Sequence, residues 1–169
     1  DPNQIKFELE KCLNYLSSGR PGPVWIDIPL DIQTAKINLK TLKSYKKINK
    51  KKKTKKIDLN RIYNAIKSSK RPVFVIGNGI HLSKSKKEFI NISNYFNIPV
   101  LSSWSASDIL ETSHKKYIGR FGIFGDRASN FTVQNSDLII VLGCRLSQPQ
   151  TGYNLKLFLP KSKMIYVDV

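Results

Sequence analysis

The sequence predicts a doubly wound α/β domain with a mostly parallel sheet, preceded by the terminal helix and strand of another α/β domain. Three observations predict this fold class. Short apolar runs alternate with helical patterns over residues 58–169. These runs are nearly unbroken Val, Ile and Leu, which is typical of strands that are covered on both faces in parallel sheets. Residues 1–40 hold one helix and one strand, which are too few to bury a core alone.

The segment 1–40 begins with an amphipathic helix. Its apolar residues recur at helical spacing: Ile5, Leu9, Cys12, Leu13 and Leu16. Gly19 then ends the helix, and the Pro-Gly-Pro sequence at 21–23 prevents its resumption. The stretch "VWIDIP" at 24–29 predicts a short apolar strand. This segment is therefore interpreted as the end of a larger domain.

Residues 41–57 are predicted to be a lysine-rich linker. The stretch 43–56 has nine lysines and no acid, out of a net charge of +17 for the whole chain. Charge blocks of this kind are usually solvated, flexible segments. The stretch has no arginine, and Tyr45 is its single aromatic residue, so it offers few groups that read phosphates or stack on bases. We favour a linker over a nucleic-acid-binding tail and expect no nucleic-acid partner.

Composition places the chain among soluble globular proteins. It is 40% hydrophobic and 24% charged, and it has no apolar run of about 18 residues, so we expect no membrane association. The first residues show no signal-peptide pattern. Cys12 and Cys144 are the two cysteines, which is too few for a disulfide framework. Cys144 is interpreted as a small buried hydrophobe. A cytoplasmic location is expected.

The remaining elements of residues 58–169 follow from caps and periodicity. The helices carry N-cap signals at Asp58 and in a capping box of Ser85 and Glu88. The first helix is expected to bury one face, Leu59, Ile62, Tyr63 and Ile66, and the second to bury Phe89, Ile92 and Phe96 with Tyr95 at the margin. A further helical turn is expected near 127–134. The predicted strands are 72–76, 98–102, 137–143 and 164–169.

The carboxyl ends of these strands carry the candidate site residues. In open parallel sheets ligands bind outside the carboxyl ends of the strands. The residues found there are Gly77, Asn78, Gly79, Ser103, Gly143, Arg145 and Asp168. Glycines permit close backbone approach, an arginine contacts phosphate, and a carboxylate accepts hydrogen bonds from ribose hydroxyls. Position 82 is Leu, so the full dinucleotide fingerprint is absent. The co-location predicts a nucleotide site.

The stretch "GRFGIFGDRASNF", 119–131, lies between the second and third of these strands. Its first residues, Gly119, Arg120, Phe121 and Gly122, are candidate ligand contacts, and Asp126 is a candidate cap for the helix that follows. The residues by themselves leave two interpretations open. The loop folds flat over a ligand, or it is a packed loop whose phenylalanines only fill the core.

Five segments of the sequence resemble one known family, in that family's order. "SGRPGPVWIDIPLDIQ" (18–33) resembles the end of the pyrimidine-binding domain of thiamine-diphosphate-dependent enzymes of the acetolactate synthase group. "RPVFVIGNGI", "NIPVLSSWSASD", the stretch from "YIGRFGIFGDRASNF" to "LSQPQTGY", and "KMIYVDV" are similar to the central domain of that group. The resemblance covers nearly the whole chain except the lysine-rich linker.

The resemblance implies an architecture of three α/β domains. Residues 1–40 would end the pyrimidine-binding domain, 41–57 would be the linker, and 58–169 would be a Rossmann-like central domain of the FAD-binding type. The remaining domains of the same chain would bind thiamine diphosphate and Mg²⁺. The whole enzyme would condense 2-oxo acids such as pyruvate in branched-chain amino acid biosynthesis, as a homodimer or homotetramer.

The resemblance also implies roles for individual residues. Gly77 and Gly79 would face the FAD diphosphate, and Ser103 would follow its strand to the flavin side. Gly119 and Gly122 would border the cofactor, and Arg145 would contact it. Flavin-binding members typically have His where Phe121 stands, and related central domains bind FAD, ADP or no nucleotide.

No residue of this chain matches the family's activating glutamate or its Gly-Asp-Gly metal motif. We therefore assign no catalytic and no metal-binding residue. His81 and His114 lie in polar loop contexts, where a surface role is expected. Two other interpretations remain, a non-catalytic nucleotide-binding module of the same fold and another thiamine-diphosphate-dependent decarboxylase or lyase of 2-oxo acids.

Overall fold

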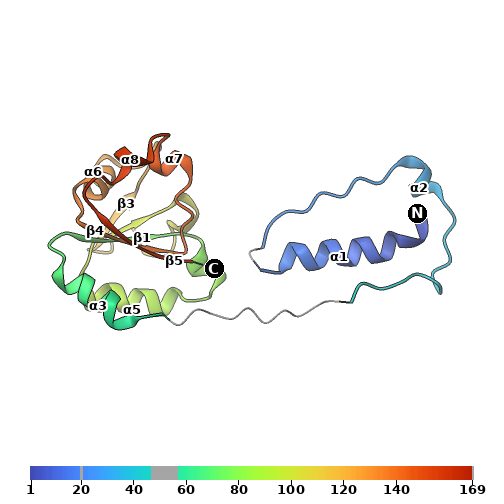
Figure 1. Ribbon diagram of the computed structural model, residues 1–169, viewed down its shortest axis with the longest axis horizontal. Helices are drawn as coiled ribbons and strands as arrows, with labels where there is room; N and C mark the ends of the chain where they lie inside the picture. Colours follow the sequence, from blue (N-terminus) through green and yellow to red (C-terminus); the bar gives the residue numbers. More distant parts are fainter. Residues whose placement is uncertain (20, 47–56, 169) are drawn as a thin grey trace. The chain divides into compact units, whose positions relative to one another are not determined.

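The structure is a computed structural model that describes residues 1–19, 21–46 and 57–168. Contacts divide the described residues into two compact units, 1–46 and 57–168, shown as ribbons in Figure 1. Each unit is considered by itself below. The predicted linker falls largely on residues 47–56, which lie outside the described residues.

The first unit is built on the predicted amphipathic helix. A 3₁₀ turn, Pro2–Gln4, leads into α1, Ile5–Ser17. The helix gives way to extended backbone at Ser18, and Gly19 adopts φ +66°, which favours glycine. Tyr45 returns to α1, where its ring meets Phe7 edge-on at 5.5 Å between centroids and its N–H donates to Glu10 at 2.7 Å. The helix prediction is confirmed.

The predicted strand at 24–29 is wrong. These residues have no regular secondary structure and form no ladder with another strand. A short helix, α2, Leu30–Thr34, follows them. Trp25 is 93% exposed. A strand needs a neighbouring strand to satisfy its backbone groups, and the described part of this unit contains none. Residues 24–29 therefore have the composition of a strand, but no neighbouring strand in the described part of this unit pairs with them.

The second unit holds a five-stranded parallel sheet. Its strands are β1, Pro72–Ile76; β2, Val100–Ser102; β3, Tyr117–Arg120; β4, Leu138–Leu142; and β5, Lys163–Val167. Their order is β3-β2-β1-β4-β5, and every neighbouring pair is parallel. The parallel α/β prediction is confirmed. The sequence missed β3, because it is short, half-exposed, contains Gly119 and pairs with a register shift.

Helices cover both faces of the sheet, so the domain is doubly wound. The side chains of β1 and β4 alternate between two cores. α3, Leu59–Ser68, and α5, Lys86–Phe96, lie on one face, and α6, Arg127–Asn135, α7, Gln148–Thr151, and α8, Leu155–Phe158, lie on the other (Figure 1). α4, Gly79–Leu82, and a 3₁₀ turn, Trp104–Ala106, follow β1 and β2.

Of the two N-terminal helix caps predicted for α3 and α5, one is confirmed and one is wrong. Asp58 caps α3 as predicted, accepting the N–H of Arg61 at 3.0 Å. The capping box of Ser85 and Glu88 does not form, because Ser85 lacks the extended backbone of an N-cap and its hydroxyl donates to the carbonyl of Ser83. A capping box forms instead at Ser147 and Gln150, at the start of α7.

The buried faces of α3 and α5 are narrower than predicted. On α3, Ile66 is buried and Ile62 packs against the core, but Leu59 is 71% exposed. On α5, Phe89 and Ser93 are buried while Ile92 is 43% exposed. Tertiary packing places the small Ser93, i+4 from Phe89, at the sheet in preference to the larger Ile92 at i+3. Cys144 is 2% exposed, as expected of a buried hydrophobe.

Asp137 ties the start of β4 to the turn before β1. Its carboxylate accepts hydrogen bonds from the Ser69 hydroxyl and from the N–H groups of Lys70 and Arg71, the last two at 2.8 and 2.9 Å. The Ser69 hydrogen bond is the largest cause that lowers the pKa of Asp137 from 3.8 to about 2, with the two backbone donors acting in the same direction. The charged form is therefore the one that holds these two segments together.

We predict that Asp137→Asn lowers the free energy of unfolding by about 2 kcal/mol at neutral pH, because the amide loses charge-assisted hydrogen bonds. The folded-state pKa is depressed, so this stabilisation is present above about pH 4 and is lost as the pH falls through about 2. Denaturant unfolding from pH 7 to 2 measures it. Glu88→Gln, on the exposed first turn of α5, is the control. Equal effects of both substitutions at pH 7 would contradict the clamp.

Candidate functional site

The predicted site residues meet in one row at the carboxyl edge of the sheet. Hydrogen bonds continue the strand ladders past the strand ends. The N–H of Ser103 donates to Ile76 at 2.8 Å, that of Gly77 to Leu142 at 3.0 Å, and that of Gly143 to Val167 at 2.9 Å. Phe121 joins the row through its N–H and the carbonyl of Ser102 at 3.4 Å. The structure thus brings together residues from all five strand ends.

The row contains the topological switch point of the sheet. From β1 the chain moves outward to β2, and from β4 it moves outward in the opposite direction to β5. Ligands of open α/β sheets bind in the crevice where the direction reverses. Here the direction reverses between the segment after β1, Gly77 to Gly79, and the segment after β4, Gly143 to Arg145.

The glycines at the switch point are required by contact between the two loops. A Cβ on Gly77 would lie 2.3 Å from the carbonyl oxygen of Gly143, and a Cβ on Gly79 would lie 2.5 Å from the Cα of Gly143. The N–H of Gly79 donates to the Gly143 carbonyl at 2.9 Å. Because the N–H groups of Gly77 and Gly79 are both used inside the protein, neither is available to a phosphate. Asn78 between them is exposed.

Three polar side chains lie at the same edge. The hydroxyl of Ser103 is buried and has no hydrogen-bond partner among the described residues, and the Ser103 residue is 8% exposed. Arg145 is exposed and forms no ion pair with a described residue. Asp168, just beyond β5, is partly buried and accepts from the Tyr166 hydroxyl at 3.4 Å. A donor, a cation and a carboxylate are thus present at one edge.

The loop after β3 is held by the side chains of Asp126 and Asn130. Asp126 occupies the N-cap position of α6 as predicted, but its carboxylate accepts the N–H of Arg120 at 2.9 Å and makes no capping hydrogen bond to the helix. Asn130 makes two hydrogen bonds with Gly122, accepting its N–H at 2.8 Å and donating to its carbonyl at 3.0 Å. Gly119 and Gly122 have φ of +126° and +107°, which only glycine adopts readily.

The phenylalanines of this loop divide between core and surface. Phe121 is 1% exposed and packs in the core on the α6 face, so its ring is not open to a ligand. Ile123 and Phe124 are 72% and 74% exposed, and the Phe124 ring lies 5.5 Å from that of Trp104, which follows β2. The core-filling interpretation therefore holds for Phe121, whereas Ile123 and Phe124 at the loop tip are exposed at the carboxyl edge and do not fill the core.

Sequence reasoning missed a pair that joins two loops at this edge. His81 on α4 contacts Asp108, after β2, with 2.9 Å between Nε2 and Oδ1, and Lys86 donates to the Asp108 carbonyl at 2.8 Å. The His81 hydrogen bond lowers the pKa of the Asp108 carboxyl. The sequence predicts only a surface role for His81, because the segments that hold His81 and Asp108 are separate in sequence and meet only in the fold.

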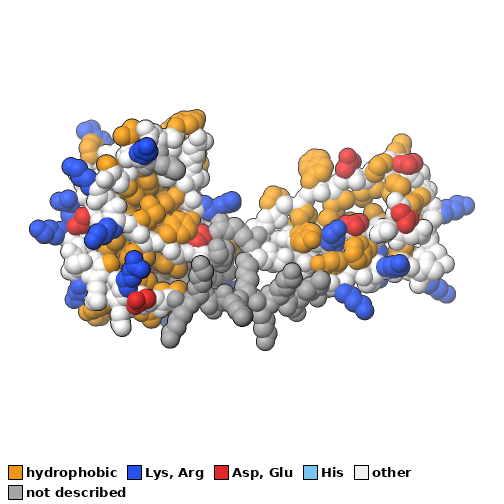
Figure 2. Space-filling model, in the orientation of Figure 1, with side chains coloured by type: hydrophobic (Ala, Val, Ile, Leu, Met, Phe, Trp, Pro, Cys, Tyr) orange, Lys and Arg blue, Asp and Glu red, His pale blue; other side chains and the backbone are white. Residues whose placement is uncertain are grey.

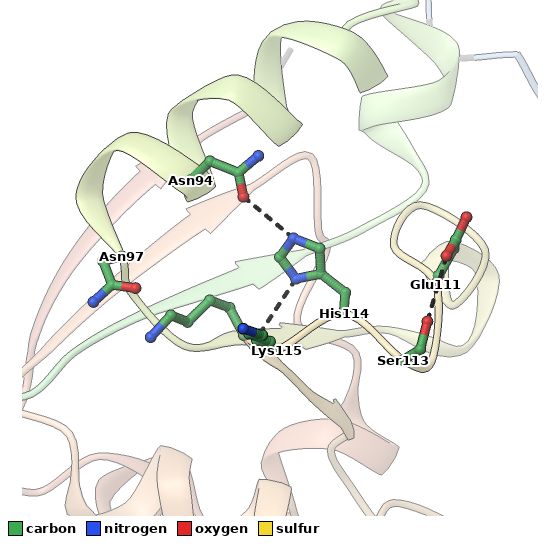
Figure 3. Close-up of a pocket in the computed structure, with 7 residues that line it drawn as sticks. Asn94, Asn97, Glu111, Ser113, His114 and Lys115 are labelled. Carbon is green, nitrogen blue, oxygen red and sulfur yellow. Dashed lines mark hydrogen bonds between the residues drawn. The ribbon is translucent and has the colours of Figure 1, made fainter.

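An open polar pocket lies at the opposite edge of the sheet, where the strands begin (Figure 3). It is lined by the end of α5, with Asn94 and Asn97, and by the loop before β3. His114 spans it. Its Nδ1 accepts the N–H of Lys116 at 3.3 Å, so in the neutral ring Nε2 carries the proton, which points at Asn94 Oδ1 3.2 Å away. The predicted site residues lie elsewhere.

Among residues 1–19, 21–46 and 57–168, no group of three His, Cys, Asp or Glu side chains is placed to hold a metal ion. None of the helices in these ranges is long and apolar enough to cross a membrane.

A parallel sheet wound on both faces, with its candidate ligand groups at the switch point, is the architecture of nucleotide-binding α/β domains. Comparison with known proteins narrows this class. Residues 59–169 match the family model described as the central domain of thiamine pyrophosphate enzymes. The chain belongs to this family, and the resemblance seen in the sequence is confirmed.

Curated relatives cover nearly the whole chain. The probable acetolactate synthase large subunit of Methanocaldococcus jannaschii is 29% identical over 173 residues, which cover 99% of this chain and 29% of the relative. That of Methanococcus aeolicus is 32% identical, covering 98% of this chain and 28% of the relative. The acetolactate synthase isozyme 1 large subunit of Escherichia coli K12 is 32% identical, covering 95% and 28%. The chain spans less than a third of these relatives.

We predict that Gly77→Ala lowers the free energy of unfolding by about 3 kcal/mol, because its methyl group would overlap the Gly143 carbonyl and force the loops apart. Asn78→Ala, at the exposed neighbouring position, is the matched control and should change stability by less than about 0.5 kcal/mol. Urea unfolding of the two variants measures the difference. A wild-type midpoint for Gly77→Ala would mean that the two loops do not pack this closely.

Proposed function

We propose that this chain is part of a longer thiamine-diphosphate-dependent enzyme that condenses two 2-oxo acids, with pyruvate as the donor, as in acetolactate synthases. The observation that carries the proposal is the match of residues 59–169 to the central-domain model, together with relatives named acetolactate synthase large subunit that align over nearly the whole chain. The chain contributes no catalytic residue of its own to this reaction.

Thiamine diphosphate supplies the electron sink for such a reaction when it is bound. We propose that domains outside this chain hold it, with Mg²⁺. Within the described residues, Asp137, whose pKa is lowered to about 2, is engaged in the clamp between the start of β4 and the turn before β1. The role of this chain would be to join and position those domains.

We propose FAD as the ligand of the carboxyl edge. The buried, unpartnered hydroxyl of Ser103 fits a polar group of the cofactor, and the exposed Arg145 fits its diphosphate. Asp168 fits a ribose hydroxyl. The N–H groups of Gly77 and Gly79 do not fit a diphosphate role, because both are already hydrogen-bonded. Side chains would then provide the polar contacts, and the glycines would let the two loops meet beneath the cofactor.

The first unit supports the proposed domain division. We propose that residues 1–40 end the pyrimidine-binding domain and that 41–57 link it to the central domain. Large apolar side chains of this unit are exposed, with Leu13 at 64%, Trp25 at 93% and Leu30 at 73%. Remaining parts of a longer domain would cover them. A cytoplasmic homodimer or homotetramer is proposed for the whole protein.

Arg145→Ala is expected to weaken FAD binding by roughly ten- to a hundredfold, because a charge-assisted contact is lost. The measurement is a titration of the longer protein with FAD, followed by flavin absorbance and fluorescence. Arg61→Ala, an exposed arginine of α3, is the matched control and should bind FAD normally. A wild-type protein that neither contains nor takes up flavin would exclude FAD and favour ADP or an empty edge.

The activity is tested on the whole reading frame. Purified with thiamine diphosphate, Mg²⁺ and FAD, it is expected to consume pyruvate and form a carboligation product, whereas residues 1–169 alone are expected to be inactive. Omission of thiamine diphosphate is the control and should abolish turnover. Release of an aldehyde without condensation would indicate a decarboxylase. Tight nucleotide binding without turnover of several 2-oxo acids would indicate a non-catalytic module.

A further inference from the structure

Two segments at the carboxyl edge are joined by a side-chain pair that the proposed FAD contacts do not include. His81 lies on α4, which follows the switch-point glycines, and Asp108 lies in the segment after β2. The His81 Nε2 atom is 2.9 Å from the Asp108 Oδ1 atom. Lys86, the first residue of α5, donates to the Asp108 carbonyl at 2.8 Å. The segment after β2 is therefore tied to both helices that follow β1.

The segment after β2 carries two residues of the carboxyl edge. Ser103 has a buried hydroxyl without a hydrogen-bond partner among the described residues, and Trp104 beside it is partly exposed. Ala106 is completely buried in the core, and its N–H donates to the Ser103 carbonyl at 3.1 Å. The core therefore holds this segment from beneath. The pair of His81 and Asp108 holds it at the surface, where the two side chains are 31% and 72% exposed.

Charge fixes which atom donates in this pair. The hydrogen bond from His81 lowers the pKa of the Asp108 carboxyl, so this group is a carboxylate near neutral pH and can only accept. In the neutral ring of His81, Nε2 therefore carries the proton, and a second proton would go to Nδ1. Protonation keeps the hydrogen bond and adds an opposite charge to it. The pair therefore tightens as the pH falls through the range in which histidines gain charge.

The pair also affects the charge that a ligand would meet. On the face of this unit that Figure 2 shows, acidic side chains are few and lysines and arginines are many. A free carboxylate at the carboxyl edge would repel the diphosphate of a dinucleotide. The carboxylate of Asp108 is instead bonded to His81, and the charge of Lys86 acts on it as well. Pairing therefore favours an anionic ligand, and does so more strongly when His81 is charged.

We propose that His81 and Asp108 are a positioning pair for the ligand of the carboxyl edge, holding the segment of Ser103 and Trp104 at a fixed distance from the switch-point loop. The pair acts through Ser103, whose hydroxyl it places, and the inference rests on the proposed FAD site. Exposed ion pairs contribute little to global stability. The effect of the pair is therefore expected in the affinity for FAD and in its pH dependence, and not in the melting temperature.

FAD titrations of the longer protein at about pH 8 and about pH 6 test the pair. Wild-type affinity should rise about two- to fivefold at the lower pH, and His81→Ala should abolish this rise. His81→Gln keeps an N–H donor in place of Nε2 but cannot gain charge. It should bind FAD like the wild type at the higher pH and show no rise. His114→Gln, at the opposite edge, is the matched control and should keep the wild-type pH profile.

A double-mutant cycle tests whether the two residues act together. In the Asp108→Ala background, His81→Ala should have no further effect on FAD affinity, because its partner is absent. An effect as large as in the wild type would overturn the pair. Equal affinities and pH profiles in wild type and His81→Ala would overturn the positioning role and leave the FAD site standing. A wild-type protein that binds no FAD would overturn the proposed site and this inference with it.

Discussion

The close crossing of two loops at the switch point is the constraint on which the rest of the central unit depends. Gly77 and Gly79 lie against Gly143 with less than the space of one methyl group between them. This contact fixes the separation of β1 and β4 where they leave the sheet, and from there the chain runs outward in opposite directions. Every later element of the sheet is positioned relative to that pair of strands.

The contact between the two loops also limits which groups of the candidate site could bind a ligand. Glycine-rich turns commonly offer free N–H groups to phosphates, but here two of those groups are used to hold the loops together. Polar recognition of a ligand would then depend on side chains at neighbouring strand ends, such as Ser103, whose buried hydroxyl has no partner among the described residues, and the exposed Arg145. A ligand would then rest on a rigid floor of backbone, with its orientation set by a few side chains around it.

The two edges of the sheet are organised differently. At the amino edge, Asp137 satisfies three donors from the turn before β1, and its lowered pKa reflects that stabilisation. At the carboxyl edge, the buried hydroxyl of Ser103 has no hydrogen-bond partner among the described residues, and an aromatic pair, Trp104 and Phe124, is exposed. Satisfied groups mark positions that stabilise the fold, and unsatisfied or exposed groups mark positions where a ligand or another part of the protein would add contacts.

Local patterns in the sequence are enough to predict the fold class, four of the five strands and the gathering of the candidate residues at one sheet edge. They are enough because apolar periodicity and strand-end chemistry are local, and because parallel strands leave their carboxyl ends on one side. Features that depend on partners distant in sequence are visible only in the folded chain. Residues 24–29 form no ladder, whereas Tyr117–Arg120 forms a strand. Ser93 is buried in place of Ile92, and His81 pairs with Asp108. The fold also directs the N–H groups of Gly77 and Gly79 into the protein, where they form hydrogen bonds. The spacing of the glycines does not specify this, because a glycine pattern indicates that space is tight but not which atoms occupy it.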